Sequence, residues 1–205
     1  MIQQPITTLR DLRDILAPPS RRVLAKETSE LDEHCRAFIA RSPFVLIGST
    51  DGAGRVDVSP KGDPPGFVHI ADPHTLVIPE RLGNHRADTF LNVLEHPAVG
   101  LLFLVPGSNN TLRIRGTALI ARDDTLRSRF EINDRLPELV LVVNVTSAFF
   151  HCGKSTIRSR LWHDASAHPA DERLLATAMT LHGQLDISID EMHDLITTDE
   201  QTRLY

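Results

Sequence analysis

A cationic segment beside a predicted helix start is the strongest indication of chemistry in this sequence. Gly83, Asn84 and His85 lead into Arg86, just ahead of an apolar repeat with helical spacing. A cation in the first turn of a helix opposes the helix dipole unless an anion lies beside it. Phosphate monoesters are bound by guanidinium groups and by N–H groups at helix starts. The segment therefore predicts a phosphate site, with a solvated helix start as the alternative.

A second phosphate-binding motif is incomplete. The residues Gly153-Lys-Ser-Thr156 match the end of a nucleotide-binding P-loop. That motif requires a glycine where this chain has Ala148, and Phe149 and Phe150 offer no glycine-rich cradle. We therefore do not expect a nucleoside triphosphate to bind here.

The two cysteines do not predict a metal site or a disulfide framework. Cys35 and Cys152 each follow a histidine directly, which is not the spacing of zinc ligands. Cys35 falls on the apolar side of a predicted helix, which favours a core position. Cys152 has basic neighbours that could activate a nucleophile, but no motif supplies an orienting acid or an oxyanion site.

Arg113 and Arg115 alternate with Leu112 and Ile114, so both arginines point away from the apolar face of a predicted strand. On a face that lines a cleft they would meet a cofactor or an acidic substrate. On a face open to water they would be ordinary solvated residues.

Composition limits the class of protein. The chain has 205 residues with a formal net charge of -5, 41% hydrophobic and 24% charged residues. These values are typical of one soluble globular domain and argue against partners such as nucleic acid or an anionic membrane. The sparse cysteines and the charged N-terminal segment lead us to expect a cytoplasmic protein.

The elements that must position these residues are mostly short strands. We predict a short helix and an extended arm over residues 1–25, a helix from Ser29 capped by Thr28 or Ser29, and a helix from Asn84 to His96. Pro60–Gly66 reads as a surface loop. Predicted strands cover residues 44–50, 55–59, 67–70, 75–78, 98–105, 111–120 and 138–146, with Leu112, Ile114 and Leu119 as inward positions of the sixth. A helix from Asp123 to about Asn133, a short one before Ser159 and two polar helices after Asp171 complete the chain.

Six or seven antiparallel strands with one inserted helix favour a barrel or sandwich over a doubly wound sheet. We expect a single domain over residues 1–205, with a helical N-terminal region (1–42), a barrel core (43–150) and a helical C-terminal segment (151–205).

Four blocks, in this order, resemble the pyridoxamine 5'-phosphate oxidase-like flavoproteins, and more narrowly a probable FMN-dependent subgroup of unassigned substrate. They are Arg55-Val-Asp-Val-Ser-Pro-Lys-Gly62, Ile78-Pro-Glu-Arg-Leu-Gly-Asn-His-Arg86, Asn110-Thr-Leu-Arg-Ile-Arg-Gly116 and His151-Cys-Gly-Lys-Ser-Thr-Ile-Arg-Ser-Arg-Leu-Trp162. The resemblance implies an α+β, mainly β fold: an antiparallel, Greek-key split β-barrel of the FMN-binding type. It also implies a homodimer with FMN at the interface and a small-molecule substrate.

The resemblance also implies which residues bind the cofactor. Lys61 falls at the family's second-strand lysine, and Asn84 to Arg86 match the Ser-Arg-Lys triplet that opens the helix in the oxidases proper. Thr111 replaces a glutamine. Only one residue of this triplet, Arg86, is certain to be positively charged at pH 7. Arg81 or Arg55 is therefore expected to supply the remaining positive charge for the phosphate. The backbone of Ser59–Gly62 would follow the flavin ring, and His151, Lys154, Arg158 and Trp162 would approach it from the partner subunit. The predicted cofactor-binding residues are Arg55, Val58, Ser59, Lys61, Ile78, Pro79, Arg81, Asn84, His85, Arg86, Thr111, Arg113, Lys154, Arg158 and Trp162.

The function expected from the resemblance is FMN-dependent oxidoreduction of a small organic substrate, with no particular catalytic side chain identified. The alternatives are a non-catalytic flavin or haem binder and a deazaflavin-dependent reductase. Oxidation of pyridoxamine phosphate itself is not expected, because residues 181–205 lack the family's C-terminal substrate-binding pattern.

Overall fold

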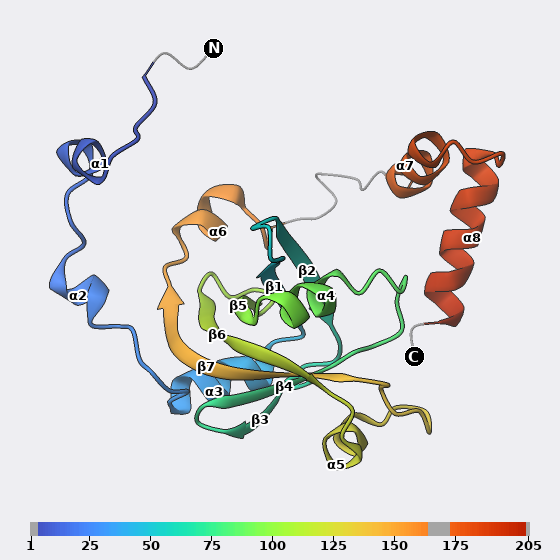
Figure 1. The fold of residues 1–205 in the computed structure, drawn as a ribbon, viewed down its shortest axis with the longest axis horizontal. Coiled ribbons are helices and arrows are strands. Elements are labelled where there is room, and N and C mark those ends of the chain that lie inside the picture. Colours follow the sequence, from blue (N-terminus) through green and yellow to red (C-terminus); the bar gives the residue numbers. More distant parts are fainter. Residues whose placement is uncertain (1–3, 164–172, 204–205) are drawn as a thin grey trace.

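Seven antiparallel strands form one sheet at the centre of the molecule (Figure 1). The computed structural model describes residues 4–163 and 173–203. The strands are β1 (Phe44–Thr50), β2 (Val56–Gly62), β3 (His69–Asp72), β4 (Thr75–Pro79), β5 (Ala98–Leu104), β6 (Thr111–Ala121) and β7 (Val140–His151), in the order β2-β1-β5-β6-β7-β4-β3. The helices are α1 (Leu9–Ile15), α2 (Arg21–Leu24), α3 (Glu33–Arg41), α4 (Asp88–Glu95), α5 (Asp124–Arg127), α6 (Lys154–Ser159), α7 (Leu174–Gly183) and α8 (Ile189–Thr202), with a 3-10 turn η1 (Ser128–Phe130). The predicted antiparallel fold with flanking helices is confirmed.

One main core lies between the inner face of the sheet and helices α3 and α4. Its fully buried members alternate along the strands, as in Val45 and Ile47 of β1 or Leu112 and Ile114 of β6. Alternation of this kind places every second side chain on the same face. The long apolar strand β5 lies third in the sheet, between β1 and β6, as its continuous hydrophobic sequence predicts.

The loop predicted for Pro60–Gly66 is wrong in its first half, because β2 continues through Lys61 to Gly62. A proline is tolerated here because β2 is an edge strand, where one side of the backbone has no ladder to complete. The consequence is that Lys61 lies on a strand beside Ser59 and not on a loop.

The helix predicted from Asn84 begins only at Asp88. The φ angles of His85 and Ala87 are 60° and 56°, left-handed values that interrupt a right-handed helix. Arg86 therefore lies before the helix, and not in its first turn.

Three smaller expectations also change. Leu119 is 57% exposed, because every second residue of β6 is buried and this alternation places Gly116 and Ala118 inward and Leu119 outward. The helix predicted from Ser29 is capped by Asp32, whose carboxylate accepts from Cys35 N, and starts at Glu33. The N-terminal region carries a second short helix, α2, where an extended arm is predicted.

Two helical segments stand away from the barrel. In Figure 1, α1 and α2 extend on one side of the sheet, and α7 and α8 lie on the opposite side. Two C-terminal helices are present as predicted, but the prediction that both are polar is wrong for α7, which is mainly apolar. None of the helices in residues 4–163 and 173–203 is long and apolar enough to cross a membrane.

Candidate functional site

A cavity of about 1000 Å³ lies beside the edge strand β2. Three stretches of chain form its walls: β2 itself, the segment from Pro79 to Phe90, and residues 127–139 between α5 and β7. A volume of this size is at the upper end of the range for cofactor and ligand sites. The cavity is therefore the first candidate for a binding site.

The β2 wall presents alternate polar side chains. Asp57, Ser59 and Lys61 are half-buried, whereas Val58 and Pro60 between them are exposed. Among the described strands β2 pairs with β1 alone, so its outer backbone edge has no strand partner. A free strand edge offers N–H and C=O groups to a bound molecule.

The second wall ends in the N-terminus of α4, which is open toward the cavity. No side chain of the described residues caps this helix, and its first backbone hydrogen bond runs from Leu91 N to Ala87 O. The N–H groups of Asp88, Thr89 and Phe90, which line the cavity, therefore lack the helical partners of later residues. Together they form the positive end of the helix dipole.

Thr89 adds an unpartnered hydroxyl at this helix start. The residue is 5% exposed, and its Oγ1 atom is buried with no hydrogen-bond partner among the described residues. Asp57 Oδ2, on the facing wall, is likewise buried and unpartnered there. Since buried polar atoms are nearly always hydrogen-bonded in proteins, both atoms are available to a molecule bound in the cavity.

Two cations of the cavity are held by neighbouring carboxylates. Lys61 Nζ lies 2.5 Å from Glu80 Oε2, with side chains 21% and 29% exposed, and 5.8 Å from the ring centroid of Phe90. Arg86 Nε lies 2.8 Å from Asp88 Oδ2 near the helix start, and this hydrogen bond raises the pKa of Arg86. Both cations line the cavity.

Arg81 has a different role, because it joins the walls. Its Nε atom donates to Asp63 Oδ2 at 2.7 Å and its Nη1 atom donates to Phe130 O at 2.7 Å. The Asp63 side chain is 2% exposed and that of Arg81 18%. A guanidinium held this way supports the geometry of the cavity, and Arg81 also lines the cavity for which the resemblance predicts it as a phosphate ligand.

Arg127 fixes the third wall. This buried residue donates from Nε to Pro137 O at 2.6 Å and from Nη1 to Asp124 Oδ1 at 2.8 Å. The link connects α5 to the start of β7 across the intervening turn. The third wall is therefore held together by a buried side chain that also lines the cavity.

Eight of the fifteen predicted cofactor-binding residues line the cavity. They are Val58, Ser59, Lys61, Pro79, Arg81, Asn84, His85 and Arg86. Among the others, Ile78 is 1% exposed because it faces the main core. Arg55 is paired with Asp51 at the β1–β2 turn, with Nε 2.5 Å from Oδ2.

The remaining predicted residues gather on β6 and around α6. Thr111 and Arg113 lie on β6, Lys154 and Arg158 on α6, and Trp162 Nε1 donates to Ser108 O at 2.7 Å. None of them lines the cavity of the single chain.

Arg113 and Arg115 lie on the outer face of the sheet, as predicted. With Lys26, they surround one aromatic ring: their charged groups lie 5.3, 5.7 and 5.5 Å from the ring centroid of Phe149. Arg115 also reaches Glu27 at 3.5 Å. This is a cation–π cluster on the outer face of the sheet.

The P-loop-like motif has a packing explanation. A Cβ atom at Gly153 would lie 2.6 Å from Asn109 Cβ and 2.7 Å from Asn109 O. Thr156 Oγ1 donates to the same Asn109 O at 3.0 Å. The glycine therefore permits close contact between α6 and the turn before β6.

Cys35 is a core residue, as predicted. It is 2% exposed, and burial raises the pKa of its thiol to about 12. Within residues 4–163 and 173–203, no group of three or more histidine, cysteine, aspartate or glutamate side chains could hold a metal ion.

Several cavity residues were missed in the sequence. Asp57, Glu80, Thr89 and Phe90 lie within or beside the recognised blocks, but only the folded wall shows that they face the cavity. The wall of residues 127–139 lies far from these blocks in the sequence. The sequence feature that could have indicated this wall is the pair Asn133-Asp134, which is typical of a tight hairpin turn. In the structure both residues have positive φ angles, 52° and 58°, as such a turn requires.

The comparisons with known proteins agree with this architecture. The family model described as Pyridoxamine 5'-phosphate oxidase matches residues 31–152. No curated protein matches the chain. A histidine-to-alanine variant of HupZ from Group A Streptococcus is similar at 16% identity and a TM-score of 0.50, over 59% of this chain and 99% of that chain.

Two further solved structures are similar at lower scores. An FMN-binding protein from Syntrophomonas wolfei has 14% identity and a TM-score of 0.46, over 63% of this chain and 86% of that chain. HutZ from Vibrio cholerae, described as a heme storage protein, has 13% identity and a TM-score of 0.39, over 60% and 94%. At these identities the likeness concerns the fold alone.

Proposed function

The chain belongs to the pyridoxamine 5'-phosphate oxidase family, and on that basis we propose that it binds FMN in the cavity beside β2 and acts as an oxidoreductase on a small organic substrate. The observation that carries this proposal is the buried, unpartnered Thr89 Oγ1 at the open start of α4. A hydroxyl and several backbone N–H groups that converge at a helix N-terminus form a site for a phosphate group.

The donors around Thr89 fit a phosphate monoester. Arg86 and Lys61 supply two cations within the same cavity, and each is held by a carboxylate that leaves some of its donors free for an anion. Asn84 Oδ1 already accepts from Arg86 N at 3.1 Å, which keeps the segment folded back toward the helix start. The phosphate of FMN would therefore bind between α4 and Lys61.

The free edge of β2 fits the rest of the cofactor. Ser59 and the backbone up to Gly62 would donate to the polar edge of the ring, and Asp57 Oδ2 would accept from a hydroxyl of the ribityl chain. Phe67 and Phe90 add apolar surface to the cavity. FMN, when bound, supplies the hydride-transfer chemistry, while the chain binds and orients the cofactor and excludes water.

The proposal includes a homodimer. The outer face of the sheet exposes Val56 and Val58 at 73% and 58%, next to a groove of about 560 Å³ over Gly48 and Gly100. Exposed apolar side chains on an edge strand favour pairing with another chain. Val58 also lines the cavity, so a second copy on this face would close the cavity from outside. Lys154, Arg158 and Trp162 of that copy would then be the groups that approach the flavin.

An absorbance titration with FMN tests the proposal. Purified protein that carries or takes up FMN will show the two visible bands of an oxidised flavin, and these will bleach when NADH or NADPH reduces it. Titration with haem and with deazaflavin in parallel separates the alternatives. A spectrum that stays unchanged with FMN but shifts with haem would replace the flavin by haem in this site.

A further inference from the structure

Two helical segments of this chain carry apolar surface that the rest of the chain leaves uncovered. We call residues 4–24, with α1 and α2, the N-terminal arm, and α7 with α8 the C-terminal hairpin. Both lie outside residues 31–152, the part that matches the family. They extend from opposite sides of the barrel (Figure 1).

The arm has one apolar stripe, and no other part of the described chain packs against it. Leu9, Leu12 and Leu16 follow helical spacing on one side of α1, and they are 70%, 38% and 56% exposed. Neither α1 nor α2 has a buried residue in the described part of the chain. A helix of seven residues is only marginally stable by itself, so α1 needs a contact surface.

The hairpin also carries an uncovered apolar surface, on helix α7. Helix α7 is apolar around most of its circumference, and α8 covers only the side that carries Ala176 and Thr180, where Met192 is buried. On the opposite side Leu174 and Leu181 are 64% and 62% exposed. A helix with apolar residues all round is typical of a buried position.

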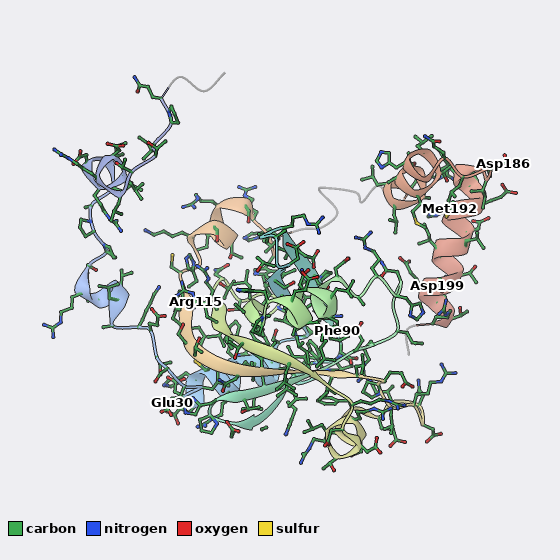
Figure 2. All side chains as sticks on the ribbon, in the orientation of Figure 1. Glu30, Phe90, Arg115, Asp186, Met192 and Asp199 are labelled. Atoms are coloured by element: carbon green, nitrogen blue, oxygen red, sulfur yellow. The ribbon has the colours of Figure 1, made fainter. Side chains whose placement is uncertain are left out.

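The two segments carry opposite charge. The arm has four arginines and two aspartates, a net charge of +2. Residues 173–203 have six acidic residues and two arginines, a net charge of −4. Two of these acids are paired inside the hairpin, Asp190 with Arg173 at 2.6 Å and Asp199 with Arg203 at 2.9 Å. The other four acidic residues are Asp186, Glu191, Asp194 and Glu200. Figure 2 shows Asp186 at the end of the hairpin opposite to Asp199.

We propose that the N-terminal arm of one copy packs its leucine stripe on the open side of α7 in a second copy, and that the two copies exchange arms reciprocally. Opposite charge and matching apolar surfaces favour this pair of segments. The arm and the hairpin lie on opposite sides of one barrel, so the contact joins two chains. The inference rests on the proposed homodimer and adds its specific contact.

Disulfide capture between two different variants tests the contact. In a Cys152→Ser background, Leu12→Cys protein is mixed with Leu181→Cys protein and oxidised; Cys35 is buried and stays silent. We expect a covalent pair with one copy of each variant as the main product. Arg129→Cys, an exposed position on η1, replaces Leu181→Cys in the control and should yield little product. High salt should slow the specific reaction, because it screens the opposite charges.

Sedimentation of the wild type separates the two levels of the proposal. A monomer at every concentration would remove the homodimer and the arm exchange together. A dimer in which the Leu12→Cys and Leu181→Cys proteins do not link, or link no faster than the control, would leave the homodimer and overturn the exchange. If the contact forms, Leu12→Asp should weaken the dimer by about a hundredfold, since the reciprocal exchange loses one buried leucine at each of its two contacts. An unchanged dissociation constant would overturn the exchange.

Discussion

Arg81 and Asp63 form an ion pair that joins the strand side of the cavity to the 3-10 turn opposite. The Nε–Oδ2 distance is 2.7 Å, and the second donor of the same guanidinium ends on Phe130 O. The Asp63 side chain is 2% exposed and that of Arg81 18%, so the pair compensates a carboxylate charge that is nearly buried. Its role is to keep the walls of the cavity at a fixed separation.

Removal of one partner should therefore destabilise the fold. We expect Arg81→Met to lower the free energy of unfolding by about 2–4 kcal/mol, because it removes the guanidinium that pairs with the buried Asp63 carboxylate. Arg55→Met removes an ion pair whose arginine is 86% exposed, and should leave the unfolding free energy nearly unchanged. Urea unfolding of both variants measures the difference. Equal effects would show that Arg81 is an ordinary surface residue.

Thr89 should matter for FMN and not for folding. Thr89→Val removes a hydroxyl that has no partner in the described chain, so the stability of the apoprotein should stay the same or rise slightly. FMN affinity should fall about tenfold, the value of one hydrogen bond to a charged phosphate. Thr89→Ser should bind like the wild type. Quenching of flavin fluorescence gives the dissociation constants, and equal affinity of the valine variant would remove Thr89 from the site.

Gly100 tests the outer face of the sheet. A Cβ atom at this position meets no atom within 4 Å in the single chain, so Gly100→Leu should leave the fold intact. On the proposed dimer face the added side chain would fill the groove that a partner must enter. We expect a folded monomer by light scattering, with an unchanged far-ultraviolet circular dichroism spectrum. A stable dimer of this variant would place the interface elsewhere.

The two cysteines should differ in reactivity. The raised pKa of Cys35, about 12, keeps its thiol protonated and unreactive near neutral pH, and burial blocks access. Cys152 is exposed. An aromatic disulfide reagent should therefore label one thiol per native chain at pH 8 and two after unfolding. Rapid labelling of both thiols in the native protein would contradict the buried position of α3.

Asp32 should contribute to the acid sensitivity of the fold. The backbone hydrogen bond from Cys35 N lowers the pKa of Asp32, so its stabilising effect is present above the unfolded-state pKa and is lost as the pH falls through the lower folded value. Asp32→Ala should cost about 1 kcal/mol at pH 7, the typical value of a lost helix cap. The difference from wild type should shrink below about pH 4. Asp32→Asn keeps a capping oxygen, so its loss at pH 7 should be smaller.

Local patterns in the sequence were sufficient for most of the sheet. β1 has the predicted bounds, β5 differs by one residue, and the alternation of Leu112 and Ile114 gives the inward face of β6. The errors lie where tertiary context overrides local preference. Pro60 is accommodated within β2 because that strand lies at the edge of the sheet. Leu119 points outward because the inward–outward alternation of β6 continues unchanged through Gly116.

The sequence by itself determined most of the elements, the inward positions Leu112 and Ile114 of β6 and the family resemblance, because periodicity and turn residues act between neighbours in the chain. Only the tertiary structure decided which charged residues share the cavity. It assigned Arg81 to Asp63 and Phe130, Arg55 to Asp51, and left Thr89 without a partner in the described chain. The physical reason is that a side chain's partners are set by the packing of strands and turns far apart in sequence, and no local pattern encodes those distances.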